Sequence, residues 1–263
     1  MMKIVVCIKQ VPDTAEVRLD PKTNTLIRDG VPSIINHDDK TGLELALRLR
    51  EKAGGSVTAV CMGPPQADTA LREALAMGCD EAVLVSAREF GGSDTYATAT
   101  ILGAALRKIG YDLVITGRQA IDGDTAQVGP QVAEQLGIPQ ISYAEEVDIQ
   151  GDALTVKRQF EDQYHILKVK TPCMITALSE LAEPRYMSVG GIVDAYNKEV
   201  KVLGFSDLKE GLNPDWIGLA GSPTNVKQSF TKQPKASGTV LSGLSADEAV
   251  EAIMSSLIER HII

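Results

Sequence analysis

The sequence predicts an α/β fold: a mostly parallel, doubly wound sheet that is extended by an antiparallel meander and followed by a C-terminal arm with a terminal helix. Two observations predict it. Up to residue 137, short apolar runs alternate with segments of helical periodicity, whereas strand-like runs separated only by short polar turns begin near residue 143. Parallel strands need long crossovers, usually helical, while antiparallel strands can be joined by tight turns. The change of pattern therefore indicates a change in strand direction.

The first half of the chain contains four β-like runs and three helical patterns. The strands are expected at residues 3–9, 57–62, 81–86 and 112–116, and the helices at 39–52, 66–77 and 95–109. In the first helix Leu43, Ala46 and Leu47 fall on one face at helical spacing, as in a helix that packs on a sheet. This alternation implies a mostly parallel sheet with helices on both faces.

A polar, glycine-containing loop at residues 117–129 lies between the fourth strand and a helical pattern that ends in Gly137. Open α/β sheets bind ligands outside the carboxyl ends of their strands, and free amides at the start of a helix favour an anion, typically a phosphate. We therefore expect a Rossmann-like, adenine-nucleotide-binding domain. The pyrophosphate should contact the backbone amides of residues 125–129.

Within this loop, individual residues have expected roles. Gly123 allows backbone conformations closed to other residues and lets a phosphate approach closely. Asp124 or Thr125 can cap a helix that begins near Ala126. Asp122 and Asp124 would repel a phosphate, so they either contact ribose hydroxyls or backbone amides, or only organise a turn. Elsewhere, Thr95 follows a Gly-Gly pair and either caps a helix or contacts the cofactor.

The rest of the chain is expected to form further strands, a short helix and an arm. The strands are expected at residues 143–149, 153–160, 164–169 and 173–177, and the helix at 192–202. From residue 204 the chain is rich in Gly, Pro and Ser and cannot bury enough apolar surface for its own core. We expect two parts: an α/β domain at 1–203 and, at 204–263, an arm and helix that pack on a partner subunit. The terminal helix, capped by Ser245, would dock on its own body or on another subunit.

Composition excludes several classes of function. The net charge of −9 argues against a broad nucleic-acid surface. The four cysteines form no Cys-x-x-Cys pair, which disfavours an iron–sulfur cluster held by this chain alone. No apolar stretch approaches the roughly 20 residues of a membrane span, and the N-terminus does not resemble a signal peptide, so we expect a cytoplasmic protein. A Gly-x-x-x-x-Gly-Lys-Ser/Thr phosphate loop is absent from the sequence.

Four segments, in this order over nearly the whole chain, resemble the β subunit of electron transfer flavoproteins. They are the first strand and its loop at 7–13, the second strand–helix unit at 62–64 with 71–80, the loop and helix at 117–139, and Leu181-Ala182-Glu183-Pro184-Arg185-Tyr186. The finer resemblance is to the electron-bifurcating branch, through residues 9–14, 91–95, 122–130 and the arm at 221–232. One departure is Asn36-His37-Asp38-Asp39, where many members carry Asn-Pro and an apolar residue, so only Asn36 carries over.

The resemblance implies a cofactor pocket and a partner-recognition loop. The implied cofactor contacts are Cys7, Asn36, Met62, Gly63, Thr95, Gly117, Gln119, Asp122, Gly123, Asp124, Thr125, Ala126, Gln127, Val128 and Gly129. The resemblance implies that adenine lies near Cys7, Asn36 and Met62. The sequence pattern alone predicts that Cys7 and Met62 are core residues. The implied recognition loop is Leu181, Glu183, Pro184, Arg185 and Tyr186, with Leu181 inserting into an acyl-CoA dehydrogenase and Arg185 paired with a nearby acid or carbonyl.

The function implied by the resemblance is that of an electron carrier with no acid–base or nucleophilic site of its own. FAD held mainly by this chain would accept hydride from NADH. One electron would pass to ferredoxin, and the other through the FAD of an α subunit to an acyl-CoA dehydrogenase or enoyl-CoA reductase. The alternative is an ordinary β subunit that holds AMP in the same pocket and carries electrons from dehydrogenases.

Overall fold

The computed structural model describes residues 2–13, 32–224, 226–227 and 238–263. It divides into two compact units, Met1–Lys227 and Gln228–Ile263. Thr14 of the first motif and residues 225 and 228–232 of the arm motif lie outside the described residues. Among the described residues, no helix is both long and apolar enough to cross a bilayer.

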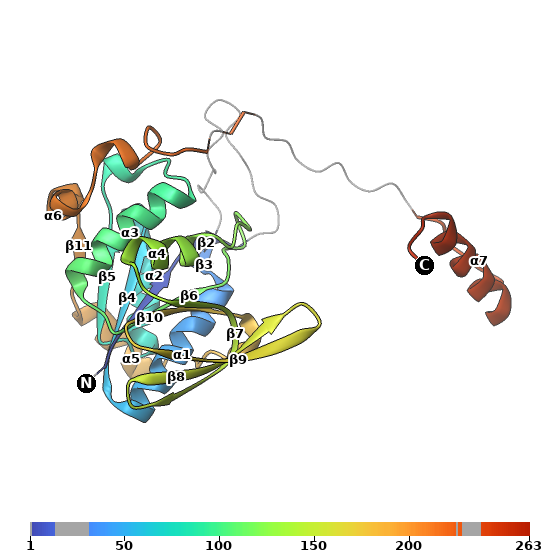
Figure 1. Cartoon of the computed structure of the whole chain (residues 1–263), viewed down its shortest axis with the longest axis horizontal. Helices are drawn as coiled ribbons and strands as arrows, with labels where there is room; N and C mark the ends of the chain where they lie inside the picture. Colours follow the sequence, from blue (N-terminus) through green and yellow to red (C-terminus); the bar gives the residue numbers. More distant parts are fainter. Residues whose placement is uncertain (1, 14–31, 225, 228–237) are drawn as a thin grey trace. The chain divides into compact units, whose positions relative to one another are not determined.

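The described residues of the first unit form a sheet of nine strands in the order β11-β5-β4-β1-β6-β10-β7-β8-β9 (Figure 1). The strands from β11 to β7 pair in parallel, and β7, β8 and β9 pair antiparallel. The strands are β1 (Met2–Ile8), β4 (Gly55–Met62), β5 (Glu81–Val85), β6 (Leu113–Gly117), β7 (Gln140–Gln150), β8 (Ala153–Phe160), β9 (Gln163–Lys170), β10 (Cys173–Ala177) and β11 (Val200–Leu203). A separate antiparallel pair is formed by β2 (Gln10–Pro12) and β3 (Ser33–Ile35).

Helices cover both faces of the parallel part, as expected of a doubly wound sheet. The helices of the first unit are α1 (His37–Ala53), α2 (Asp68–Met77), α3 (Thr95–Ile109), α4 (Val128–Leu136), α5 (Val189–Asn197) and α6 (Phe205–Leu208), and the second unit contains α7 (Ala246–Glu259). One apolar core contains residues of α1, α2 and α5, and the other contains residues of α3, α4 and α6. Along β1, Ile4 and Val6 belong to the first core and Val5 to the second, because successive side chains point to opposite faces.

The predicted elements of the first half are confirmed with small shifts at their ends, and the helix at 95–109 has the predicted bounds. The meander is shorter than predicted: Cys173–Ala177 is not its fourth strand, but lies between β6 and β7 and is parallel to both. All five of its residues are buried. A strand covered on both faces is typical of the interior of a parallel sheet, and that position depends on partners distant in sequence.

The helix predicted at 192–202 is only half right. Helix α5 ends at Asn197, and Val200–Leu203 forms β11, which pairs in parallel with β5 at the edge of the sheet. The alternating Val-Lys-Val segment suits an edge strand, but the free edge of β5 that it joins is a tertiary feature.

The first compact unit reaches Lys227, beyond the domain boundary expected at residue 203. Leu208, Leu212 and Ile217 are buried in the second core, which explains why this stretch belongs to the α/β body. In the second unit, Ser245 caps α7 as predicted: its hydroxyl accepts from the amide of Glu248. The Glu248 carboxylate in turn accepts from the Ser245 amide, which completes a capping box. The docking of the arm and helix on a partner subunit stays a prediction.

Candidate functional site

The loop between β6 and α4 lies where the strand order of the sheet reverses. β1 pairs with β4 on one side and with β6 on the other, and both pairings are parallel. The carboxyl ends of β1 and β6 therefore lie side by side, with Cys7 opposite Thr116. Ligands of open α/β sheets bind in the crevice at such a switch point. The fold thus brings the predicted loop to a binding position.

Asp39 joins the two strand ends from the first turn of α1. Its carboxylate accepts hydrogen bonds from the amides of Lys9, directly after β1, and Gly117, at the end of β6, both at 2.8 Å. Burial raises the pKa of Asp39 to about 7, against the opposing effect of the two amides and the Asn36 side chain. Gly117 has to be glycine, because a Cβ atom there would lie 2.4 Å from Oδ1 of Asp39. Sequence reasoning gave Asp39 no role, although a charged residue in an otherwise apolar helix face was a usable signal.

Asn36 holds the loop itself. Its side chain is fully buried; Nδ2 donates to the carbonyl of Gln119 at 2.8 Å, and Oδ1 accepts from the amide of Ile121 at 3.0 Å. The buried Asn36 side chain therefore satisfies two backbone groups of the loop and holds them in fixed positions. Asn36 is thus placed at the predicted site, with a positioning role that the sequence did not reveal; its contact with adenine stays a prediction.

The two aspartates of the loop have different partners. Both oxygens of Asp122 accept from Lys9 Nζ, at 2.7 and 2.8 Å, and this carboxylate is only 6% exposed. Asp124 accepts from Nε2 of Gln119 at 3.0 Å within the loop. The ion pair of Asp122 was not foreseen, because Lys9 lies more than a hundred residues away in the sequence.

The start of α4 differs from the prediction. The helix begins at Val128 with Gln127 at its N-cap, so neither Asp124 nor Thr125 caps it. Positive φ angles occur at Asp124 (49°) and Ala126 (52°), not at Gly123. The helix therefore begins two residues later than expected, and left-handed conformations of Asp124 and Ala126 provide the bends of the loop before it. A left-handed alanine is uncommon and costs energy, which often marks a functional loop.

The start of α4 has several backbone amides without a backbone acceptor. Within the described residues, these are the amides of residues 125–129. Ala126 with positive φ is followed by Gln127 in the right-handed region, a succession that turns neighbouring amides toward a common anion. At Gly129 a Cβ atom would lie 2.8 Å from Oγ1 of Thr116, so glycine lets the helix start lie directly on the strand end. The hydroxyl of Thr116 is buried and finds no partner among the described residues. This donor set fits the phosphates of a nucleotide cofactor.

Thr95 borders the same loop from α3. It is the first residue of the helix but not its cap, because Asp94 accepts from the amide of Ala97 at 3.0 Å. The Thr95 hydroxyl instead donates to Oε1 of Gln127 at 3.1 Å. Two predicted site residues from separate elements are therefore in contact.

The remaining predicted cofactor residues end neighbouring strands. Met62 and Gly63 lie at the carboxyl end of β4, where the Gly63 amide donates to the carbonyl of Val85 at 3.1 Å. Cys7 is buried in the second core, and burial raises the pKa of its thiol to about 12, so it is a neutral core residue as its pattern predicted. Within the described residues, no hydrogen bond joins Met62 or Gly63 to the loop, and their part in binding stays a prediction.

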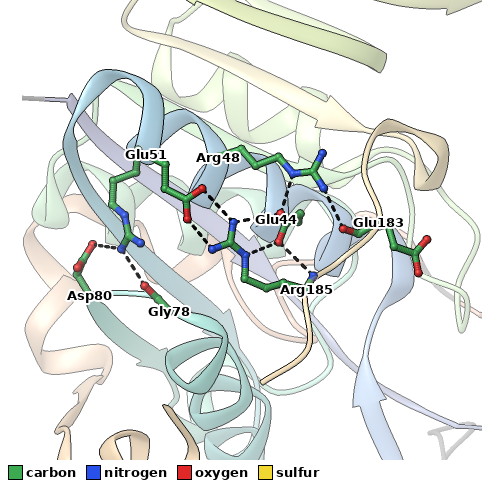
Figure 2. Close-up of polar contacts among 8 residues, drawn as sticks. Glu44, Arg48, Glu51, Gly78, Asp80, Glu183 and Arg185 are labelled. Carbon is green, nitrogen blue, oxygen red and sulfur yellow. Dashed lines mark hydrogen bonds and ion pairs between the residues drawn. The ribbon is translucent and has the colours of Figure 1, made fainter. Parts of the chain in front are cut away.

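The predicted recognition loop, residues 181–186, lies beside α1 (Figure 2) and is distinct from the nucleotide loop, the segment between β6 and α4. Tyr186 is 98% exposed, whereas Leu181 is half-buried and packs against the first core. The insertion of Leu181 into a dehydrogenase stays a prediction. Arg185 forms ion pairs with Glu44 at 2.7 Å and Glu51 at 2.6 Å, as expected for a structural arginine. The described residues contain no group of three His, Cys, Asp or Glu side chains that could hold a metal ion.

Comparisons with known proteins agree with this geometry. A model of the electron transfer flavoprotein domain matches residues 23–208. The electron transfer flavoprotein subunit beta of Thermoanaerobacterium thermosaccharolyticum is 57% identical over the full length of both chains. The caffeyl-CoA reductase-Etf complex subunit CarD of Acetobacterium woodii is 50% identical, and the acryloyl-CoA reductase electron transfer subunit gamma of Anaerotignum propionicum is 49% identical, each over the full length of both chains. The chain therefore belongs to the electron transfer flavoprotein family and is a β-subunit member of it.

Proposed function

We propose that this chain binds FAD at the loop between β6 and α4, accepts hydride from NADH and bifurcates its electrons. One electron goes to ferredoxin, and the other goes through the FAD of an α subunit to an acyl-CoA dehydrogenase or enoyl-CoA reductase. The observation that carries this proposal is the full-length similarity, near one half identity, to two subunits named for the caffeyl-CoA reductase and acryloyl-CoA reductase systems.

The loop supplies the binding groups that this function requires. The free amides of residues 125–129 suit the pyrophosphate of a dinucleotide, and a second phosphate group needs more donors than the single phosphate of AMP. Lys9 is half-exposed beside the loop and pairs with Asp122, so it offsets the negative charge that this carboxylate would present to a phosphate. Cys7, Asn36 and Met62 would flank the adenine, as the family resemblance implies. When bound, a flavin supplies the capacity to accept a hydride and to release electrons one at a time.

The chain's own residues position the cofactor and carry no acid–base chemistry. Asp39 and Asn36 fix the first part of the loop, residues 117–121, by bonds to its backbone, so this part need not reorganise on binding. The recognition loop at 181–186 contacts the dehydrogenase or reductase, and the arm with α7 packs on the α subunit. In α7, Val250, Ile253, Met254 and Ile258 are exposed, as suits a helix whose partner is another chain.

The first test is the cofactor content of the heterodimer with its α subunit, by FAD absorbance and chromatography of the released nucleotides. About two FAD per heterodimer and no AMP is the expected result. A single FAD together with AMP would instead identify the ordinary carrier, and the bifurcation proposal would be wrong while the pocket assignment would remain.

The second test is NADH oxidation by the heterodimer with ferredoxin and an acyl-CoA dehydrogenase of the same organism. We expect ferredoxin reduction only when an enoyl-CoA substrate is also present, since the uphill electron depends on the downhill one. Rapid ferredoxin reduction without the enoyl-CoA would contradict the proposed coupling.

A further inference from the structure

The recognition loop is tied to α1 by one arginine and two glutamates (Figure 2). Glu44 accepts hydrogen bonds from Arg185 Nε at 2.7 Å, from Arg185 Nη2 at 3.1 Å and from the Arg185 backbone amide at 3.2 Å. Glu51, two turns further along the helix, accepts from Nη1 at 2.6 Å and from Nη2 at 3.3 Å. A guanidinium that is shared by two carboxylates has its plane fixed, because each pair restricts a different edge of the group.

Glu44 is the buried centre of this arrangement. Its side chain is 3% exposed, whereas Arg185 is 32% and Glu51 is 52% exposed. Burial raises the pKa of the Glu44 carboxyl, but hydrogen bonds from Arg185 and Arg48 outweigh it and the pKa lies below its usual value. Arg48 also donates to the carbonyl of Glu183 at 3.2 Å, which fixes a second point of the loop. The loop is thus held at 183 and 185, on either side of Pro184.

The same helix holds the nucleotide loop at its other end. Asn36 and Asp39, at the N-terminus of α1, bond to Gln119, Ile121 and Gly117, whereas Glu44, Arg48 and Glu51 bond to the recognition loop. One rigid element therefore sets the positions of both segments relative to the sheet. Around the buried Glu44, Arg185 and Glu51 lie at a partly exposed edge of the body.

We propose that Arg185, clamped by Glu44 and Glu51, is the positioning residue of the recognition loop and fixes the conformation in which Tyr186 meets the dehydrogenase partner. The inference rests on the proposed function, in which this loop contacts that partner. An unclamped loop samples other conformations, and the partner then binds only the fraction of molecules with the correct one. Loss of the clamp weakens docking and leaves the cofactor site unchanged.

The experiment measures the rate of electron exchange between the heterodimer and an acyl-CoA dehydrogenase of the same organism, against dehydrogenase concentration. For Arg185→Gln we expect the KM for the dehydrogenase to rise about tenfold, with kcat nearly unchanged. Arg185→Lys should give an intermediate KM, because an ammonium group cannot pair with both carboxylates in the same way. FAD content and reduction by NADH or dithionite should match the wild-type protein.

Arg50→Gln is the matched control. Arg50 also lies on α1 and donates to the Gly78 carbonyl at 2.8 Å and Asp80 at 3.1 Å, and within the described residues it forms no hydrogen bond or ion pair with the recognition loop. Its KM should equal that of the wild type. An equal rise in Arg50→Gln and Arg185→Gln would show a general effect on the body and would overturn the inference.

Tyr186→Ala separates this inference from the proposed function. A raised KM in Tyr186→Ala with a normal KM in Arg185→Gln would overturn the positioning role and leave the docking role intact. Normal KM values in both variants would remove the loop from the partner contact, and the inference would fall with that part of the proposed function. A double variant, Glu51→Gln with Arg185→Gln, should be no worse than Arg185→Gln alone, since within the described residues the ion pair of Glu51 is with Arg185 and both substitutions break that contact.

Discussion

The nucleotide loop and the recognition loop are both attached to α1, but by different chemistry. The nucleotide loop is held by buried side chains, Asn36 and Asp39, that bond to backbone amides and a carbonyl. The recognition loop is held largely by the ion pairs of Arg185 with Glu44 and Glu51 at a partly exposed edge. Of these three side chains, only Glu44 is buried. Buried bonds to backbone are unaffected by salt and expensive to break, whereas exposed ion pairs are screened and contribute little each.

The difference matches the role proposed for each loop. A phosphate site needs amides fixed in direction before the ligand arrives, and a buried clamp provides this. A surface that meets another protein tolerates small adjustments, which charged side chains with long stems allow. The comparison predicts large effects on folding at the first loop and small effects at the second.

The largest effect should come from the buried carboxyl of Asp39. The pKa of Asp39 is raised from an ordinary 3.8 to about 7. The folded state therefore binds more protons than the unfolded state between these values, and the unfolding free energy falls as pH rises from about 4 to about 7, by up to about 4 kcal/mol from this group. In Asp39→Asn this part of the pH dependence should vanish. Urea unfolding from pH 4.5 to 8 checks it; parallel curves for variant and wild type would contradict the buried titration.

A pair of glycines sharpens the contrast between packing and binding. In Gly117→Ala the new Cβ would meet Asp39, and we expect a loss of about 2–3 kcal/mol in unfolding free energy, as for other overpacked sites. At Gly123 no atom lies within 4 Å of the added Cβ, and its φ is not positive. Gly123→Ala should therefore fold normally but retain less FAD after gel filtration, if a phosphate approaches this backbone. Normal stability in Gly117→Ala would contradict the close approach of β6 to α1.

The clamp of Asn36 gives the next effect. Asn36→Ala leaves the carbonyl of Gln119 and the amide of Ile121 without their partner, which should cost about 2 kcal/mol and lower FAD retention. Asn213→Ala is the control, because this exposed asparagine also accepts from a backbone amide, that of Asp215 at 3.1 Å. We expect less than about 1 kcal/mol there. Equal losses of unfolding free energy at the two positions would show that burial of the Asn36 side chain does not increase the cost of removing its hydrogen bonds.

The smallest effect should come from the exposed member of the recognition-loop clamp. Glu51→Gln removes one ion pair of Arg185 while Glu44 keeps the other, so the unfolding free energy should change by less than about 0.5 kcal/mol. Raising the salt concentration should erase even that difference. A loss similar to that of Asn36→Ala would place the clamp among the buried contacts and remove the contrast between the two loops.

Local pattern was sufficient for the elements and the position of the nucleotide loop. The periods of two and 3.6 residues located β1, α3 and the loop before α4 because they reflect which side chains face a core. They located β10 but not its parallel position between β6 and β7, and they missed β11, because the neighbours β6 and β5 of these strands are far away in the sequence. They also failed at the start of α4, where the left-handed Ala126 delays the helix.

The contacts that hold the site could not be read from the sequence. The bonds from Asp39 to Lys9 and Gly117, and those from Asn36 to Gln119 and Ile121, join residues between 30 and 85 positions apart. The same is true of Arg185 and Glu44, which are 141 positions apart. A sequence pattern records the polarity of each residue but not which distant backbone group will satisfy it.

The sequence by itself determined that the chain alternates strands and helices, that a glycine-containing polar loop follows β6, and that four ordered segments match one family. Such properties depend on local hydrophobic spacing and on residue identity, which the chain carries wherever it folds. Only the tertiary structure decided that β10 lies inside the parallel sheet, that Asp39 and Asn36 fix the nucleotide loop, and that α1 holds both loops. Burial makes the difference, because an unpaired polar group away from water is costly and the packed fold alone determines which partner it meets.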